Sequence, residues 1–291
     1  MHFDDRLLRA YRSLDGLAVG DCYGNHHSHN QKKRLAEIWE WSDDTLMALS
    51  VVSNLRQFGT INQDVLAESF AQRREGRRSY GQGATRLLKQ IQSGTAWKTA
   101  TYEMFEGSGS YGNGSAMRVA PLGAYFAEDM ERVVKEAHLS SEVTHAHPEG
   151  IAGAIAVAVA AALVVHDSTI SVQRFFEGII AHTPQSEVRE SIQKALTFSA
   201  ETSFYQASLE LGNGRPSIAQ RTVPFALWAA AQTLTDYKSA IEKTANVGGD
   251  VDTNCAIVGG IVVMQTGLEG IPIAWRERSE PLPRWAFEET L

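Results

Sequence analysis

The sequence predicts an all-α fold, a single-domain orthogonal helical bundle over residues 1–291, and three observations support this. Apolar residues recur at helical spacing along most of the chain, whereas the apolar/polar alternation of a half-buried strand never persists. Ser, Thr and Asp stand where helices would begin, and glycine separates the apolar runs. No Pro/Ser-rich linker and no repeat with a period of about 20–50 residues divides the chain. One domain is therefore favoured over two.

The expected helices follow one another in chain order, separated by capping or glycine signals. They cover residues 4–19, 43–58, 63–74, 83–93, 116–126, 130–141, 148–166, 171–180, 186–204, 222–233, 237–246 and 252–265. The clearest starts are Ser42, Ser186 and Asp236, whose short side chains can accept from the free N–H groups of a first turn. The longest apolar run, 151–165, is rich in alanine and shorter than the roughly 20 residues of a bilayer span. We expect it to be a central core helix.

Composition and charge exclude several classes of protein. Lys and Arg total 27 against 34 Asp and Glu, a net charge of −7, which argues against a protein that tracks nucleic-acid phosphates. Cys22 and Cys255 are the two cysteines, without metal-binding or redox spacing, so buried free thiols are expected. The acidic N-terminus does not resemble a signal peptide. We therefore expect a monomeric cytoplasmic protein that has no membrane partner.

Glycine gathers in two loops, 107–115 and 248–253, and each precedes an apolar helix. A loop dense in Gly, Ser and Asn exposes backbone N–H groups and allows a ligand to approach closely, which suits an anion such as a diphosphate. A tight turn is the simpler interpretation of either loop taken alone.

Two largely apolar helices are expected to begin with paired aspartates. Ser42-Asp43-Asp44-Thr45 opens one, and Asp250-Val251-Asp252-Thr253 opens the other. Helix capping alone would explain either pair. Because helices this apolar should be interior, their four carboxylates would be drawn together with little water and would repel one another unless a cation compensates them. Asp, Ser and Thr supply hard oxygen ligands, which favours Mg²⁺, Mn²⁺ or Ca²⁺ over zinc, with material for two ions.

The histidines and tryptophans carry weaker signals. His26, His27 and His29 are expected in a polar loop, either solvated or loosely metal-binding. His145 and His147 directly precede the alanine-rich helix, where they could line a pocket or cap that helix. Trp39 and Trp41 flank Glu40 just before the first aspartate pair, and we expect both to serve packing.

Five segments together resemble the ADP-ribosylglycohydrolase family. In chain order these are Gly16 to Asp21 with Gly24, Trp41 to Thr45, Gly109 to Pro121, Thr144 to Pro148, and Gly248 to Thr253. They extend over residues 16–253, most of the chain. The run from Gly112 to Arg118 and the paired aspartate clusters are the most specific of the five when taken together.

The resemblance implies an all-α fold with a binuclear magnesium cleft at helix N-termini, in which Mn²⁺ could replace Mg²⁺. It implies hydrolysis of an N- or O-glycosidic bond at the anomeric carbon of the distal ribose of ADP-ribose, carried by a protein or a small compound. The implied metal ligands are Ser42, Asp43, Asp44, Asp250, Asp252 and Thr253. The implied substrate-binding residues are Gly109, Ser110, Tyr111, Gly112, Asn113 and Gly114 around the diphosphate and ribose, with His145 on the distal-ribose side.

The expected mechanism has the metals hold two ribose hydroxyls and a water, with Asp43 or Asp252 as the catalytic general base. Two residues depart from the family pattern. Ser42 stands where threonine is usual, which keeps the ligand oxygen. Ser28 stands where some members that cleave O-linkages carry glutamate, a carboxylate that Glu37 or Glu40 could replace by folding back.

Two alternatives remain open at this stage. Asp250-Val251-Asp252 is also a DxD of the kind that glycosyltransferases use to hold Mn²⁺, although their fold requires parallel strands that the sequence does not indicate. The family also includes crystallin-like members without hydrolase activity, so a catalytically silent or redirected ADP-ribose-binding protein is the second alternative.

Overall fold

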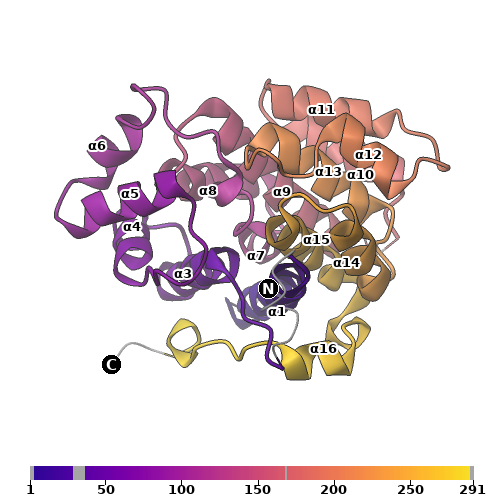
Figure 1. The fold of residues 1–291 in the computed structure, drawn as a ribbon, viewed down its shortest axis with the longest axis horizontal. Coiled ribbons are helices and arrows are strands. Elements are labelled where there is room, and N and C mark those ends of the chain that lie inside the picture. The colour runs from indigo at the N-terminus through magenta and orange to yellow at the C-terminus, as the bar shows by residue number, and fades with distance from the viewer. Residues whose placement is uncertain (1–2, 29–36, 168, 289–291) are drawn as a thin grey trace.

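The computed structural model describes residues 3–28, 37–167 and 169–288, and within these ranges the chain folds into helices joined by turns (Figure 1). Two isolated bridges, between Trp39 and Ser279 and between Gly112 and Ile218, are the extended pairings in the described residues. The all-α prediction is confirmed. The described residues form no sheet of parallel strands, so the fold does not support the glycosyltransferase alternative.

The helices have the following bounds. They are α1 (Phe3–His27), α3 (Asp43–Phe58), α4 (Gln63–Gln72), α5 (Gln82–Gln92), α6 (Trp97–Tyr102), α7 (Ala120–Tyr125), α8 (Met130–Glu142), α9 (Pro148–His166), α10 (Val172–His182), α11 (Glu187–Leu196), α12 (Phe204–Leu211), α13 (Ala219–Ala231), α14 (Tyr237–Asn246), α15 (Val251–Thr266) and α16 (Ile273–Arg278). Short 3-10 turns cover Asn113–Ser115, Leu268–Gly270 and Arg284–Ala286.

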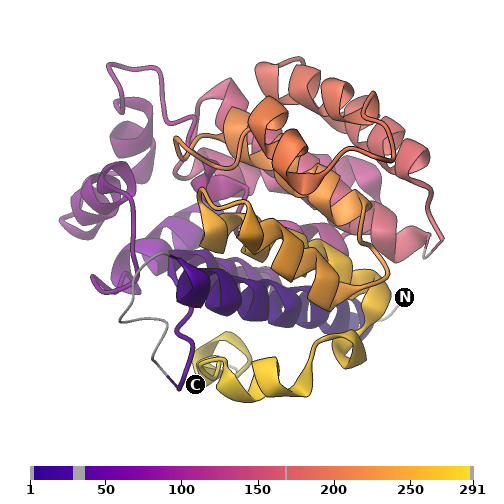
Figure 2. The same cartoon turned by 45° about the vertical axis from the view of Figure 1, so that its right-hand side comes forward.

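Helices α1 and α15 form the closest pair in the fold, and they run side by side in Figure 2. Three glycines of α1, spaced four residues apart, let the two backbones touch, because a Cβ at Gly20 would overlap the carbonyl of Cys255 and one at Gly24 would overlap that of Val251. The helices are antiparallel, so the C-terminal half of α1 meets the N-terminus of α15. This contact brings Asp21 of α1 close to Asp252 at the start of α15.

Helix α9 lies in the core, in contact with α7, α8, α10, α13 and α15. It is long and apolar enough to cross a membrane by length and composition, but 78% of that stretch is buried inside the protein. Alanine dominates its surface, which permits close packing on several sides at once. The prediction of a central core helix over residues 151–165 is confirmed.

Three predicted helices need correction, and one helix was not predicted. Helix α1 continues to His27 instead of ending at 19, because Gly20 and Gly24 serve helix packing and not chain termination. The helix expected over 186–204 is two helices, since the Ser203 side chain caps α12 in a reciprocal pair with Gln206. Helix α6 was not predicted. Residues 116–119 form turns, so the helix expected from 116 begins at Ala120.

Candidate functional site

Both aspartate pairs and the first glycine-rich loop line one cleft of about 370 Å³. Helix α5 and the segment before it form one wall, on the left of Figure 1, and the start of α15 forms another. Segments far apart in the sequence therefore converge. The predicted residues on the cleft surface are Asp43, Asp44, Ser110, Tyr111, Gly112, Asn113, Gly114, His145, Asp250, Asp252 and Thr253.

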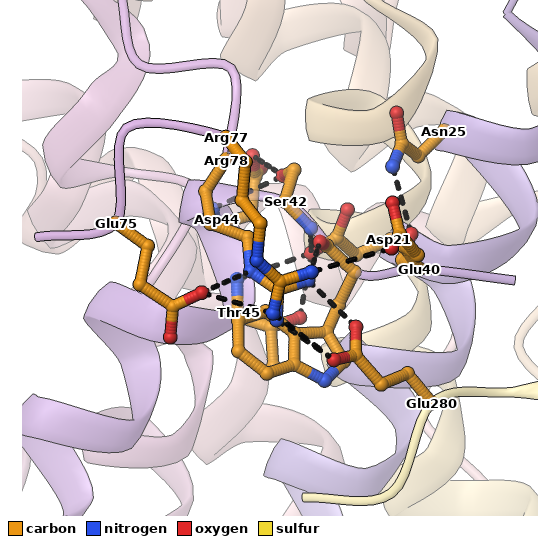
Figure 3. Close-up of polar contacts among 11 residues, drawn as sticks. Asp21, Asn25, Glu40, Ser42, Asp44, Thr45, Glu75, Arg77, Arg78 and Glu280 are labelled. Atoms are coloured by element: carbon orange, nitrogen blue, oxygen red, sulfur yellow. Dashed lines mark hydrogen bonds and ion pairs between the residues drawn. The ribbon is translucent and has the colours of Figure 1, made fainter.

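At the start of α3, buried polar groups hold the first aspartate pair (Figure 3). Ser42 is the N-cap; its hydroxyl donates to Oδ2 of Asp44 at 2.7 Å and accepts the Asp44 N–H at 3.2 Å. Asp21 reaches across from α1, and its Oδ2 accepts the N–H of Ser42 at 2.8 Å and the Thr45 hydroxyl at 2.6 Å. The backbone N–H of Asp43 donates to the carbonyl of Arg78 at 2.9 Å. The first turn of α3 is thus fixed from two sides.

At the start of α15, two asparagines position the second pair. The amide of Asn113 donates to Oδ2 of Asp250 at 2.8 Å and to the Thr222 hydroxyl at 3.0 Å. The backbone N–H of Asp250 donates to the carbonyl of Asn213 at 2.9 Å. Asp252 extends from the first turn of α15, within hydrogen-bonding reach of the Asp250 carboxylate. The glycine-rich loop and the aspartates are therefore joined directly through Asn113.

The carboxylates of this cluster repel one another, and burial together with this repulsion raises their pKa values. Burial, then the neighbouring Asp21 carboxylate, raises the pKa of Asp43 to about 8. Burial followed by the charges of Asp21, Asp252 and Asp43 raises the pKa of Asp44 well above its usual range. Burial and the Asp250 charge do the same to the pKa of Asp252. Without a compensating cation, burial and mutual repulsion therefore disfavour the ionised form of these groups.

The donor set fits a hard divalent cation. Oδ1 of Asp21 and Oδ1 of Asp44 are buried and accept no hydrogen bond from the described residues, so two negative oxygens lack a partner within the chain. Carboxylate and hydroxyl oxygens are the ligands that Mg²⁺ and Mn²⁺ prefer. As they stand in the described part of the chain, no three Asp, Glu, His or Cys side chains enclose a common point as a finished ligand group. The cluster therefore offers oxygen ligands around the cleft, with no closed cage.

A charged clamp supports the backbone that leads into Asp43 (Figure 3). The guanidinium of Arg78 lies 3.3 Å from the centre of the Trp41 ring and donates to both carboxylate oxygens of Glu280, at 2.6 and 2.8 Å. Glu75 accepts a further hydrogen bond at 3.0 Å. Because the Arg78 carbonyl accepts the Asp43 N–H, the clamp connects the C-terminal segment to the aspartate cluster. Trp41 has the packing role that was expected.

The glycine-rich loop packs tightly against the turn that precedes α9. Gly109 has a positive φ of 73°, and a Cβ there would meet the backbone nitrogen of His147. Gly112 and Gly114 lie against the ring of His145, so any larger residue would displace the imidazole. His147 is the N-cap of α9 and accepts the N–H of Glu149, as the capping alternative proposed. His145 instead faces the cleft.

An apolar wall completes the cleft. Leu87 and Leu88 of α5 line it, and the aromatic rings of Phe105 and Tyr111 lie at its mouth, 6.4 Å apart and inclined by 32°. Both rings are unusually exposed for their size, at 50% for Phe105 and 42% for Tyr111. Exposed aromatic faces beside a polar cleft suit a flat ring such as a nucleobase.

Several predicted residues lie outside the cleft surface. Ser42 is buried behind it, and Gly109 turns the loop without lining it. Neither Glu37 nor Glu40 folds back to the aspartates; the Glu40 carboxylate pairs with Arg77 at 3.2 Å.

The histidine-rich loop expected after residue 25 also needs correction. His26 and His27 belong to the last turn of α1, where both are half-buried and pack against aromatic rings. His26 stacks on the buried ring of Trp39, and His27 stacks on Tyr23. His29 lies outside the described residues.

Sequence reasoning did not assign a site role to Asp21, Arg78 or Phe105. Asp21 lies within the segment that carries the family resemblance, but its proximity to Ser42 depends on the packing of α1 against α3 and on no local pattern. Arg78 lies in an Arg-rich stretch in which no motif distinguishes it from its neighbours. Phe105 has a positive φ of 51° just before the glycine run, which sequence does not signal.

Comparison with known proteins places the chain. The family model described as ADP-ribosylglycohydrolase matches residues 3–290. The ADP-ribosylhydrolase ARH3 of Gallus gallus is 30% identical, with 87% of this chain and 76% of the relative covered. The ARH3 of Mus musculus is 27% identical, with 98% and 90% covered, and a protein of Archaeoglobus fulgidus is 30% identical, with 90% and 88% covered.

A solved structure described as an ADP-ribosylglycohydrolase-related protein complex shares the fold, with a TM-score of 0.66, 95% of this chain and 94% of that chain covered, and 23% identity. The family model spans nearly the whole chain, and the aspartate cluster and glycine-rich loop that carried the resemblance line a common cleft. The chain belongs to the ADP-ribosylglycohydrolase family and is a glycosyl hydrolase that acts on ADP-ribose.

Proposed function

We propose that the protein uses Mg²⁺ to hydrolyse the glycosidic bond between the distal ribose of ADP-ribose and an acceptor, and releases free ADP-ribose. The acceptor is a protein side chain such as arginine, or a small leaving group. One observation carries the proposal: an anion-binding loop, two exposed aromatic rings and four carboxylates line the same cleft. The loop suits the diphosphate of one ligand, the aromatic rings suit its base, and the carboxylates, through a cation, suit its sugar hydroxyls.

The glycine-rich loop would bind the middle of the substrate. The backbone N–H groups of Ser110 and Tyr111 make no hydrogen bond to the described residues, and the absence of side chains at Gly112 and Gly114 lets a diphosphate approach the backbone. The adenine ring would lie at the mouth, against the faces of Phe105 and Tyr111. This orientation points the distal ribose toward the aspartates.

The cation would be held by Asp43, Asp44, Asp250, Asp252 and Thr253, with Ser42 behind Asp44. When bound, a divalent cation supplies Lewis acidity to sugar hydroxyls and water and neutralises the carboxylates that otherwise repel. Asp44 is held by Ser42, and Asp250 by Asn113, so both side chains are oriented before substrate arrives. Asp43, partly exposed at the cleft surface, and Asp252 are the candidates to take a proton from water.

A second candidate function is ADP-ribose binding without hydrolysis. One observation favours it, namely that the described Asp, Glu, His and Cys side chains do not form a closed ligand group as they stand. Ser28 supplies no carboxylate near the cleft either; its hydroxyl donates to the carbonyl of Asn25 at 2.7 Å. The two candidates differ in whether cation addition produces turnover or only tighter binding.

The experiment is a panel of ADP-ribosylated arginine, ADP-ribosylated serine and small ADP-ribosyl compounds, scored for release of ADP-ribose with Mg²⁺ and with a chelator. The proposal expects release from at least one substrate in Mg²⁺ and loss of release with chelator. Binding of ADP-ribose without release from any member would favour the second candidate. Release that is unaffected by chelator would contradict the role given to the cation.

A further inference from the structure

Arg118 is a buried cation whose partners are all neutral. Its side chain has no exposed surface, and it forms no ion pair with a described carboxylate within 4.0 Å. The guanidinium donates to the carbonyl of Ser140 at 2.8 Å and to the Thr144 hydroxyl at 2.9 Å, and it stacks over Phe70 at 4.3 Å. The charge of Asp43 acts on Arg118 only from beyond ion-pair distance, so the burial of this cation without a contacting anion is costly.

The hydrogen bond from Arg118 determines the direction in which the Thr144 hydroxyl donates its own proton. A hydroxyl has one proton to donate, and Oγ1 of Thr144 lies 2.7 Å from Nδ1 of His145. Because Oγ1 already accepts from Arg118, its proton is satisfied by donation to Nδ1. The opposite arrangement, with Nδ1–H donating to Oγ1, would leave the hydroxyl proton of a buried threonine without an acceptor among the described residues. Nδ1 of His145 is therefore the unprotonated nitrogen.

The other ring nitrogen then carries the proton, and it faces the cleft. Nε2 of His145 lies beside the glycine-rich loop, where a Cβ at Gly112 would be 3.2 Å away and one at Gly114 would be 3.1 Å away. Nε2 makes no hydrogen bond to the described residues. The loop has glycine where any side chain would cover this nitrogen, so Nε2–H stays open to a ligand.

We propose that Arg118 is a positioning residue that acts through Thr144 to hold His145 as the neutral Nε2–H tautomer, a hydrogen-bond donor to an oxygen of the bound ligand. The tautomer is a property of the chain alone. Its use toward a ribose hydroxyl or phosphate oxygen of ADP-ribose rests on the proposed function.

The surroundings also keep the imidazole uncharged. Burial, and after it the positive charge of Arg118, lowers the pKa of His145 to about 3. A ring that neither gains a proton near neutral pH nor exposes a lone pair cannot act as general base from Nε2. This separates His145 from the proton transfer assigned to the aspartates and gives it a binding role.

The test is ¹⁵N NMR of the side-chain imidazoles in the full chain without cations, with the His145 signals identified by their loss in His145→Gln. We expect one His145 nitrogen of the protonated type, Nε2, and one of the unprotonated type, Nδ1, unchanged from pH 5 to 8. His147, whose Nδ1 accepts the Glu149 N–H, is an internal reference. A His145 ring that is protonated at Nδ1 would overturn the proposal.

Two matched variants of Thr144 test whether its hydroxyl sets the tautomer of His145. Thr144→Val removes the hydroxyl at nearly constant volume, so the His145 nitrogens should shift toward values that average both tautomers, whereas Thr144→Ser should keep the wild-type pattern. Arg118→Gln, with folding checked by its amide spectrum, should raise the pKa of His145, because the charge of Arg118 lowers it in addition to burial. Wild-type signals in Thr144→Val would overturn the proposal even if Arg118→Gln does not fold.

Binding of ADP-ribose, measured without cations, supplies the second readout. Thr144→Val should weaken binding about tenfold and Thr144→Ser less than about twofold, since one oriented donor is lost in the first and kept in the second. If the tautomer is found as expected but ADP-ribose does not bind the wild-type protein either without cations or with Mg²⁺, the proposed function fails and the tautomer assignment stands. Equal binding by both variants would overturn the donor role of His145.

Discussion

The two ends of the cleft differ in whether their buried polar groups find hydrogen-bond partners within the chain. The aspartate end, made by Asp43, Asp44, Asp250 and Asp252, gathers like charges and leaves an oxygen of Asp44 without a partner. The glycine end, made by residues 109–114 and His145, holds a neutral histidine whose Nδ1 is satisfied within the chain. One end is incomplete without a cation, and the other is fixed before any ligand arrives.

This difference indicates a division of labour. Unpaired buried carboxylates destabilise the protein and persist where function requires them. A preorganised donor and an open backbone instead hold the ligand with little reorganisation. Changes at the aspartate end should therefore affect turnover far more than binding and relieve repulsion in the cation-free protein. Changes at the glycine end should affect binding and leave that repulsion in place.

The largest effect is expected at the aspartate end. Asp44→Asn or Asp252→Asn should lower the rate of ADP-ribose release by about two to four orders of magnitude, because a charged ligand of the cation is lost while the shape of the side chain is kept. The same variants should raise the melting temperature of the chelated protein. Asp236→Asn, which keeps the N-cap of α14 far from the cleft, is the matched control and should change neither quantity. Variants with full Mg²⁺-dependent turnover would remove these residues from the site.

At the mouth of the glycine end, Phe105→Ala and Tyr111→Ala should raise KM about tenfold each, with kcat changed less than about twofold. Loss of stacking against a base removes about 1–3 kcal/mol of binding that is used equally before and during the reaction. Tyr205→Ala, which removes an exposed tyrosine outside the cleft, is the control. A fall in kcat without change in KM would argue that these rings act on the reacting sugar and not on the base.

The stability of the chelated protein should fall as pH rises. The folded-state pKa of Asp43 is about 8, above its ordinary value, so its protonated form stabilises the fold fully below pH of about 4, and this contribution is lost as pH rises toward 8. The melting temperature in chelator should drop by several degrees across that window. Added Mg²⁺ should restore it at pH 8. In Asp44→Asn, with one fewer like charge, the drop should be smaller. A melting temperature in chelator that rises across the window would contradict the repulsion.

The smallest effect is expected at the clamp behind Asp43. Glu280→Gln removes a charge from the bidentate pair with Arg78 but leaves the Glu75 bond and the Trp41 ring contact. We expect a loss of about 1–2 kcal/mol in the free energy of unfolding, seen in denaturant titration, and a fall in turnover of a few fold. Glu277→Gln, on exposed α16, is the control. A loss of turnover as large as that of Asp44→Asn would make the clamp part of the catalytic machinery.

Much of the fold follows from local signals, and the exceptions have one physical cause. Ser42, Ser186 and Asp236 cap helices as predicted, because an N-cap depends on a few neighbouring residues. Gly20 was interpreted as a break, yet it lies within α1 because the backbone of α15 passes over it. A long-range contact reversed the meaning of a local residue.

The site divides along the same line. The aspartate pairs and glycine-rich loop are contiguous in sequence and could be recognised there, together with His145. Asp21 and Arg118 could not be assigned, since the role of each depends on a partner elsewhere in the fold: Thr45 of α3 for Asp21, and Thr144, in the turn between α8 and α9, for Arg118. The polar residues of the cleft surface leave a local pattern, whereas Phe105 and the residues that orient the site from behind do not.

The central claim is that the two ends act together through a cation, and calorimetric titration of Mg²⁺ with and without saturating ADP-ribose tests it most directly. We predict that the wild-type protein binds two Mg²⁺ ions, that ADP-ribose tightens their binding, and that Mg²⁺ tightens ADP-ribose by the same factor. Asp252→Asn should lose this coupling while Thr144→Val keeps it. Absence of Mg²⁺ binding at millimolar concentration, or ADP-ribose affinity that is independent of Mg²⁺, would contradict the claim.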